Sequence, residues 1–230
     1  MGRARADRIR GVYDALLGRH GDPGWWPGDG AFEIMVGAVL TQNTAWRNVE
    51  RALGNLKDAR ALSPRAIVGA HPRRLAAWLR PSGYYNVKAR RLRALCWMIL
   101  QRGGIARLGR MPTPQLREAL LEVHGVGPET ADDILLYAFD RPVFVIDAYT
   151  RRIFTRLGVI GGDERYEALR RVFEEDIGPS VPVFKRYHGL IVTHAKDVCR
   201  VRPRCEHCVL AQGCRRAARV GPAHAASGGR

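Results

Sequence analysis

Residues 121–131 read LEVHGVGPETA and place a Gly-Val-Gly turn, at 125–127, between two stretches with helical periodicity. The stretches 116–123 and 131–139 carry apolar residues three and four positions apart, as amphipathic helices do. Pro128 suits the first turn of the second helix, because the N–H that proline lacks has no partner there. This stretch therefore predicts two helices joined by a tight hairpin.

The turn is a candidate binding site for a phosphate group. Glycine adopts open backbone angles, so main-chain N–H groups at such a turn can approach an anion, assisted by the positive end of the following helix. Such contacts hold DNA without reading its sequence. The candidate contacts are Gly125, Val126, Gly127 and Thr130. An ordinary connection between helices is the alternative, and the turn alone does not decide between the two.

Helical signals recur along the rest of the chain. Apolar residues keep a spacing of three and four in 149–157 and 164–177, and extended alternating runs are scarce. Ser63 and Thr113 each place a capping oxygen immediately before a proline and predict helix starts. With 230 residues, 46% of them hydrophobic, the chain can bury a substantial core. The predicted fold class is all-α.

The formal net charge of +16 predicts attraction to a polyanion such as nucleic acid. Only four of the 38 basic residues are lysines, so arginine, whose planar fork fits phosphate oxygens, carries the excess. A GC-rich genome also raises the arginine content, so the charge alone leaves DNA binding open. The N-terminal stretch lacks the apolar segment of a signal peptide, and no run of 18 apolar residues occurs. We therefore expect no membrane span and a cytoplasmic, reducing environment.

Four of the five cysteines lie within sixteen residues near the C-terminus, at Cys199, Cys205, Cys208 and Cys214. Disulfides are disfavoured in a reducing compartment, so this spacing, with gaps of five, two and five residues, predicts a metal site. An iron–sulfur cluster and a structural zinc ion both accept four thiolates. The fifth cysteine, Cys96, lies in an apolar helical stretch and is expected to be a small core side chain.

Asp147 is a further candidate functional residue, where the apolar run 143–146 ends and the next helical stretch begins. A carboxylate at the start of a helix commonly caps it by accepting hydrogen bonds from N–H groups of the first turn. The local pattern therefore favours a capping role, and a catalytic role depends on the surrounding motifs.

Taken together, the GVGPETA hairpin, Asp147 eighteen residues beyond Glu129, and the cysteine cluster resemble the endonuclease III family of helix-hairpin-helix DNA glycosylases. The resemblance covers nearly the whole chain and implies two α-helical domains that flank a DNA cleft. One implied domain is a six-helix barrel with the helix-hairpin-helix, and the other joins both ends of the chain and carries the cluster loop before a disordered tail. The corresponding residues are 30–140 (motif about 116–139), 1–29 with 141–217 (loop 199–214), and 218–230.

The same resemblance implies a 4Fe-4S cluster on the four cysteines in preference to zinc. The family's loop has six residues in its first gap, whereas this chain has five. Arg200, Arg202 and Arg204 lie between the first two cysteines, so the loop is also a candidate phosphate-contacting surface.

Two positions of the family pattern bear on the reaction. Asp147 matches the catalytic aspartate, whose carboxylate stabilises the positive charge that develops on the sugar as the glycosidic bond breaks. Bifunctional members carry a lysine two residues after the second glycine of the hairpin, where its amine forms a Schiff base with the sugar. Here that position is Glu129, and a carboxylate cannot form the imine. The departure predicts a monofunctional glycosylase without lyase activity.

A second signature, Trp25-Trp26-Pro27 followed by TQNT and Trp46, resembles the 3-methyladenine DNA glycosylase III branch of the family. The resemblance implies that Trp25, Trp26, Pro27 and Trp46 line the pocket for a flipped base, where stacking favours an alkylated, cationic purine. Core packing is the alternative for adjacent tryptophans. Gln42 matches the family position that fills the space left by the extruded nucleotide, although a polar residue at a helix end has other uses.

The leading hypothesis is a base-excision-repair glycosylase that hydrolyses alkylated purines such as 3-methyladenine from double-stranded DNA. Such an enzyme would act as a cytoplasmic, nucleoid-associated monomer with no membrane partner. One alternative is an endonuclease III-like glycosylase for oxidised pyrimidines or mismatches, with or without lyase activity. The other is a protein that binds DNA lesions without turnover.

Overall fold

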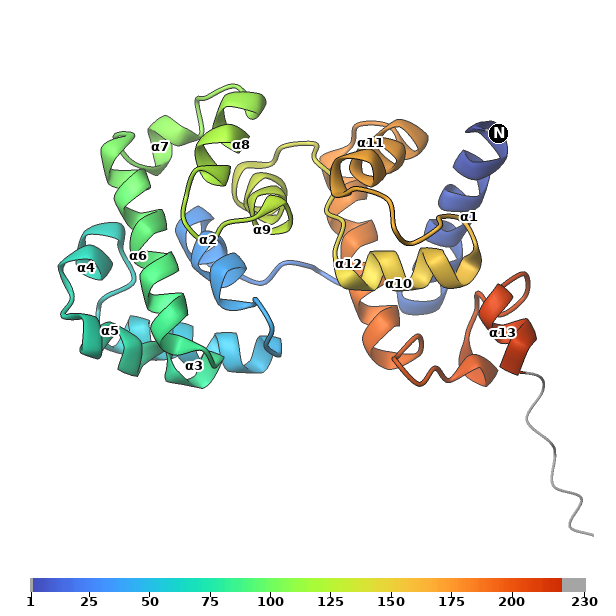
Figure 1. The fold of residues 1–230 in the computed structure, drawn as a ribbon, viewed down its shortest axis with the longest axis horizontal. Helices are drawn as coiled ribbons and strands as arrows, with labels where there is room; N and C mark the ends of the chain where they lie inside the picture. The colour runs from blue at the N-terminus through green and yellow to red at the C-terminus, as the bar shows by residue number, and fades with distance from the viewer. Residues whose placement is uncertain (1, 221–230) are drawn as a thin grey trace, which may run out of the picture. The chain divides into compact units, whose positions relative to one another are not determined.

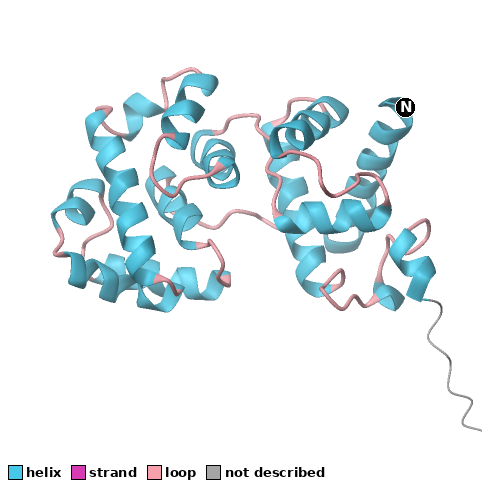
Figure 2. Ribbon diagram, viewed as in Figure 1, coloured by secondary structure: helices cyan, strands magenta, loops and turns pink. Residues whose placement is uncertain are grey.

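The computed structural model describes residues 2–220, and every regular element in that range is helical (Figure 2). The predicted all-α fold class is therefore confirmed. The chain forms two compact units, which we name the terminal unit (Met1–Trp25 with Val143–Arg230) and the central unit (Trp26–Pro142). The predicted boundaries lay after residues 29 and 140. Within 2–220, no helix combines the length and the apolar character needed to cross a membrane.

In the central unit, α6 packs against α2, α4 and α5 (Figure 1). Helix α2 is buried continuously from Met35 to Leu40, because its sequence is apolar on nearly all sides. The hairpin elements α8 and α9 also pack on each other, and a π-helical turn, η2, continues α9 and packs on α2. The elements are α2 (Ala31–Leu40), α3 (Trp46–Asp58), α4 (Pro64–Gly69), α5 (Pro72–Leu79), η1 (Arg80–Ser82), α6 (Tyr85–Gln101), α7 (Ile105–Leu108), α8 (Thr113–Leu121), α9 (Pro128–Asp133) and η2 (Ile134–Ala138).

In the terminal unit, α12 packs against α1 and α10, and α11 packs against α1. Its core is aromatic: Phe144 stacks on Phe173 at 5.0 Å between ring centroids and meets Phe184 edge-on at 5.3 Å. This cluster anchors the loop that leads to α10. The elements are α1 (Gly2–His20), α10 (Ala148–Leu157), α11 (Tyr166–Ile177), α12 (Val181–Asp197), η3 (Cys205–His207) and α13 (Arg215–Val220).

The two predicted proline-led helix starts have different outcomes. Ser63 accepts a hydrogen bond from the Ala66 N–H at 3.2 Å and caps α4, as predicted. Thr113 does not cap α8, and that prediction is wrong. The carbonyl of Pro112 accepts from the Leu116 N–H at 3.0 Å, so the helix begins one residue earlier than the sequence suggested.

The C-terminal end also differs from expectation over three residues. Helix α13 runs to Val220, whereas 218–230 was predicted to be a disordered tail. Alanine and arginine have high helix propensity, which is the physical reason the helix extends past 217. Residues 221–230 lie outside the described part of the chain.

Candidate functional site

Asp147 begins α10 directly after the buried apolar residues 143–146. Its Oδ1 accepts hydrogen bonds from the Thr150 backbone N–H at 2.6 Å and from the Thr150 hydroxyl at 2.8 Å. The capping role suggested by the sequence is therefore confirmed. These two bonds engage one carboxylate oxygen, so the other oxygen can serve a second purpose.

The second oxygen of Asp147 faces His188 on α12. The distance between His188 Nε2 and Asp147 Oδ2 is 3.5 Å, and the two residues are only 3% and 8% exposed. Burial raises the pKa of Asp147, but the contacts from His188 and Thr150 outweigh it and leave the pKa below its ordinary value. The carboxylate is therefore ionised at neutral pH although it lies inside the protein.

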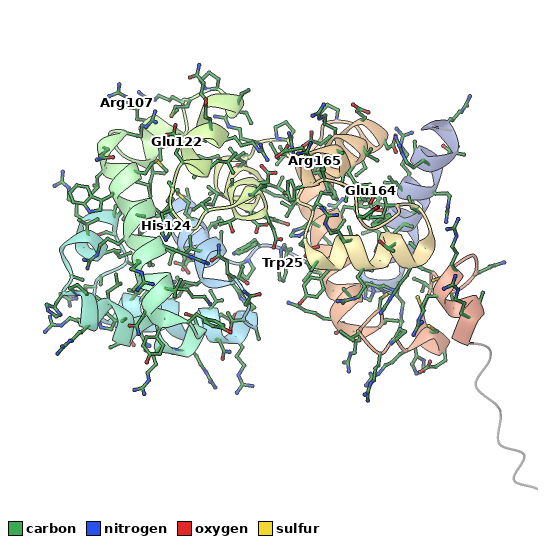
Figure 3. All side chains as sticks on the ribbon, viewed as in Figure 1. Trp25, Arg107, Glu122, His124, Glu164 and Arg165 are labelled. Carbon is green, nitrogen blue, oxygen red and sulfur yellow. The ribbon has the colours of Figure 1, made fainter. Side chains whose placement is uncertain are left out.

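Trp25 lies on the loop that follows α1 (Figure 3) and packs against α12, the helix that carries His188. A Cβ added to Gly189 would lie 2.6 Å from the Trp25 Cβ, so the glycine permits close packing of the loop on α12. The Lys196 Nζ lies 5.3 Å from the centre of the Trp25 ring, within cation–π range. Residues 189 and 196 are seven positions apart and therefore lie on the same face of α12, so both can contact the Trp25 side chain.

The other predicted pocket residues fall in the central unit. Trp26 meets Trp46 edge-on and also contacts Tyr137, in each case at 5.1 Å between ring centroids. Gly37 of α2 lies under this group: a Cβ there would come within 3.2 Å of Trp46. Pro27 is exposed in the connecting loop. The structure thus brings Trp26 and Trp46 together and places Trp25 in the terminal unit.

The hairpin between α8 and α9 has one glycine that its geometry requires. Gly125 has φ +85°, in the region that favours glycine, whereas Gly127 has the extended value of −95°. The Val126 N–H donates to the Val123 carbonyl at 3.0 Å, so this predicted phosphate donor is already used within the turn. Exposed His124 lies on the loop between α8 and α9 (Figure 3). Exposed Glu129 lies in the first turn of α9.

Gln42 ties the end of α2 to this hairpin. Its amide nitrogen donates to the Gly125 carbonyl at 3.1 Å and to the buried Thr130 hydroxyl at 2.9 Å, while its oxygen accepts from Arg91 Nη1 at 2.5 Å. The amide therefore serves internal contacts in this structure. Insertion of Gln42 into a duplex, as the family resemblance implied, requires these three hydrogen bonds to break. On α6, the neighbouring Lys88 is buried and donates to the Leu40 carbonyl at 2.9 Å, which fixes the end of α2.

The four cysteines near the C-terminus line one small cavity. Arg156 of α10 lies against this loop: its guanidinium donates to the Cys199 sulfur and carbonyl, both at 3.3 Å, and to the Val201 carbonyl at 3.0 Å. Burial, reinforced by the neighbouring thiols, raises the pKa of Cys205 and of Cys208. Arg200, Arg202 and Arg204 are exposed on the same loop.

The donor set of this cavity is four thiols, which a zinc ion and an iron–sulfur cluster both accept. Around one zinc, each sulfur lies ~2.3 Å from the metal. Within 2–220, no three Cys, His, Asp or Glu side chains are gathered closely enough to hold a single ion. The four thiols surround a common cavity.

Several residues of these sites carry no sequence signal strong enough to single them out. His188 and Tyr137 each lie in apolar helical stretches, where a polar side chain has many uses. Arg91 is one of many arginines. Tyr84, immediately before α6, is 72% exposed and has a left-handed backbone with φ 45°, which is unusual for an aromatic residue.

Comparison with protein families gives a match to the HhH-GPD superfamily of base excision DNA repair proteins over residues 36–179. A curated protein of Methanocaldococcus jannaschii, named "Putative DNA repair glycosylase", is 42% identical over 212 residues, covering 90% of this chain and 96% of that protein. Endonuclease III of Thermotoga maritima is 30% identical over 188 residues, covering 80% and 82% of the two chains.

Two solved structures resemble the chain over most of its length. The Helicobacter pylori 3-methyladenine DNA glycosylase bound to 1,N6-ethenoadenine has a TM-score of 0.72 and 32% identity, covering 84% of this chain and 97% of that one. A non-covalent endonuclease III–DNA complex has a TM-score of 0.81 at 22% identity, covering 94% and 97%. The second likeness is one of fold.

Proposed function

Since the chain belongs to the HhH-GPD superfamily of base excision DNA repair proteins and is a DNA glycosylase, we propose that it hydrolyses the N-glycosidic bond of an alkylated purine without lyase activity. The observation that carries the proposal is Asp147, a buried carboxylate whose pKa is lowered by Thr150 and His188. The proposed substrate is double-stranded DNA with a damaged base, and the proposed active form is a monomer in the nucleoid.

In this proposal Asp147 acts on the sugar of the flipped nucleotide. Loss of the base leaves positive charge on the sugar ring, and an ionised carboxylate in a site that excludes water stabilises that charge strongly. The same carboxylate orients the water that attacks C1′ and accepts its proton. A buried aspartate with a lowered pKa suits both steps, because it is already charged when the bond breaks.

Glu129 is the basis for proposing hydrolysis alone. It occupies the hairpin position at which bifunctional relatives carry a lysine, and a carboxylate has no amine for a Schiff base. The product would then be DNA with an abasic site and an unbroken sugar-phosphate backbone.

Aromatic side chains support an alkylated purine as the substrate. Trp26, Trp46 and Tyr137 form one cluster, and the face of Trp25 already attracts the ammonium of Lys196. A purine methylated on a ring nitrogen, as 3-methyladenine is, carries a positive charge in DNA and would be held by the same attraction to an electron-rich ring. The similar Helicobacter pylori enzyme was solved with a modified adenine.

We propose that Cys199, Cys205, Cys208 and Cys214 hold a 4Fe-4S cluster, which would crosslink the C-terminal loop. Arg156 would hold the loop in place through its contacts with Cys199 and Val201. The purified protein should be brown and contain iron and sulfide in the amounts expected for one cluster per chain. Elemental analysis that finds zinc in place of iron would contradict the assignment.

Phosphate binding is proposed for two surfaces, each within its own unit. In the central unit, the hairpin backbone is exposed at Gly127 and half-buried at Gly125. In the terminal unit, the exposed Arg200, Arg202 and Arg204 supply charge. Both contribute affinity that falls with added salt.

The test incubates the purified protein with duplexes that carry 3-methyladenine, 1,N6-ethenoadenine, thymine glycol, uracil or 8-oxoguanine. Half of each reaction is treated with alkali. Release of an alkylated purine, with strand breaks only after alkali, is the expected result. Borohydride trapping of a covalent complex on lesion DNA would contradict the absence of lyase activity, and release confined to thymine glycol would contradict the substrate.

A further inference from the structure

We propose that His188 is a positioning residue for Asp147: from α12 it holds the second carboxylate oxygen, while Thr150 holds the first from α10. The inference rests on the proposed function, because it concerns the same carboxylate. It adds a residue 41 positions away in sequence, which lies beyond the motifs that identify the reaction.

Packing brings the two side chains together. Helices α10 and α12 contact each other within the terminal unit (Figure 1). His188 Nε2 lies 3.5 Å from Asp147 Oδ2, within ion-pair distance and slightly longer than an ordinary hydrogen bond. Both residues are less than a tenth exposed, so the contact is formed away from bulk water. An imidazole protonated on Nε2 donates to the carboxylate whether it is neutral or charged.

The number of contacts on Asp147 explains why a second anchor matters. A carboxylate offers about four lone-pair sites. Thr150 uses two of them on Oδ1, which leaves the terminal torsion of the side chain soft. His188 lies against Oδ2, where a small approach of its N–H would occupy a third site and restrict that torsion. The remaining site on Oδ2 is where we place the sugar cation and the attacking water.

Charge gives the contact a second consequence. The titratable groups that act on Asp147 are His188 and Lys196, both on α12, and α10 contributes the neutral Thr150. Burial alone raises the pKa of Asp147, so removal of the His188 donor moves that pKa upward. The carboxylate then takes up a proton at a higher pH and loses its charge over a wider acidic range.

The experiment compares three substitutions in the full-length protein: His188→Gln, His188→Asn and His188→Phe. Glutamine can bring an amide N–H to the position of Nε2, whereas asparagine reaches only the position of Nδ1. Phenylalanine keeps a ring and removes the donor. Single-turnover excision is measured across acidic to alkaline pH, DNA affinity is measured in parallel, and thermal unfolding verifies that each variant is folded.

The expected result separates the glutamine variant from the other two. His188→Phe and His188→Asn excise at least ~10-fold more slowly at neutral pH, and their acid limb moves up by at least ~1 pH unit. Their affinity for DNA stays within about twofold of the wild type, because the contact acts on the chemical step. His188→Gln keeps most of the rate and the wild-type acid limb.

An acid limb that stays in place in the Phe and Asn variants overturns the proposal, and so does equal loss in the Gln and Asn variants. If His188→Phe does not fold, the comparison of excision rate and acid limb between His188→Gln and His188→Asn still tests the proposal. If the wild type releases no base, the proposed function fails, but the inference is then tested by NMR titration of the carbon-13 signal of the Asp147 carboxyl. A higher pKa in His188→Asn than in the wild type supports it, and equal values overturn it.

Discussion

The terminal and central units stabilise their polar site residues in opposite ways. In the terminal unit, a buried charge on Asp147 depends on hydrogen bonds from Thr150 and on the nearby imidazole of His188. In the central unit, the neutral amide of Gln42 joins the end of α2 to the hairpin at Gly125. A buried charge is costly without partners, whereas a neutral amide requires mainly correct geometry. Substitutions in the first region should therefore change the chemistry, and those in the second should change how DNA is held.

The largest effect is expected for Asp147→Asn. Asparagine is a good N-cap, so it can replace the bond to the Thr150 N–H and preserve the start of α10. It removes the negative charge, and we expect excision to slow by about 10²–10³-fold. Single-turnover excision and DNA affinity, measured together, check this expectation. DNA affinity should change little.

Asp147→Ala is the matched control for the cap. It removes both the charge and the bonds to Thr150, so it should also lower the free energy of unfolding by about 1 kcal/mol. Equal stability of the Asn and Ala variants would show that the cap contributes little. An Asn variant that retains full activity would remove Asp147 from the reaction.

A smaller effect, on binding, is expected in the hairpin for Gly125→Ala. This residue has φ +85°, and a Cβ would lie 2.3 Å from the Arg91 Cγ, so the turn and the Arg91 side chain must both shift. The strain is ~1–3 kcal/mol, and we expect about a tenfold or greater loss of affinity for undamaged duplex DNA. Fluorescence anisotropy at fixed salt measures it.

Gly127→Ala is the control from the same turn. Gly127 has an extended φ of −95°, and no atom lies within 4 Å of an added Cβ. We expect near-normal affinity. Equal losses at the two glycines would mean that a side chain at the hairpin blocks DNA sterically, and that the backbone angle of Gly125 is not the cause.

Local sequence patterns were sufficient for the features that depend on neighbouring residues. The periodicity of 116–123 and 131–139 predicted both hairpin helices, and the position of Pro128 in the first turn of α9 followed from its chemistry. Asp147 was placed at a helix start for the same reason. The prediction that Thr113 caps α8 was wrong because a helix start depends on which carbonyl accepts the first hydrogen bond. Pro112 and Thr113 were both suitable, and the Pro112 carbonyl accepts it.

Contacts between distant segments could not be predicted in this way. His188 reaches Asp147, and Arg91 reaches Gln42, only because separate helices pack together. The role of Gln42 shows the same limit: its sequence position suggested insertion into DNA, but the three internal bonds of its amide depend on α6 and the hairpin. The gathering of four cysteines around one cavity was easier to foresee, because they are close in sequence.

A third prediction concerns the link between α6 and Gln42. Arg91→Met removes the donor to the Gln42 oxygen and should lower base excision by roughly fivefold, because Gln42 and the hairpin lose their common anchor. The control is Arg90→Met, which removes the same charge from the adjacent exposed position. A general effect of charge on DNA binding would be equal in the two variants.

A double-mutant cycle with Gln42→Ala sharpens this comparison. Residues in one hydrogen-bond network couple by about 0.5–3 kcal/mol, so the double variant should lose less than the sum of the single losses. Additive losses of unfolding free energy and of excision rate would show that Arg91 acts independently of Gln42.

The smallest effect, a change in base preference, is expected when the charge of Lys196 in the terminal unit is removed. Its ammonium lies over the Trp25 ring and near Asp147, so it occupies an attractive site for a cation. An exposed cation–π contact contributes ~0.5–1 kcal/mol, and Lys196→Met should therefore favour a cationic base over a neutral one by roughly two- to fivefold. The ratio of excision rates for 3-methyladenine and 1,N6-ethenoadenine measures this preference.

Lys185→Met removes the same charge from an earlier turn of α12 and should leave the ratio unchanged. An unchanged ratio in Lys196→Met would mean that Trp25 does not hold the base, and would limit base stacking to the Trp26 and Trp46 cluster of the central unit.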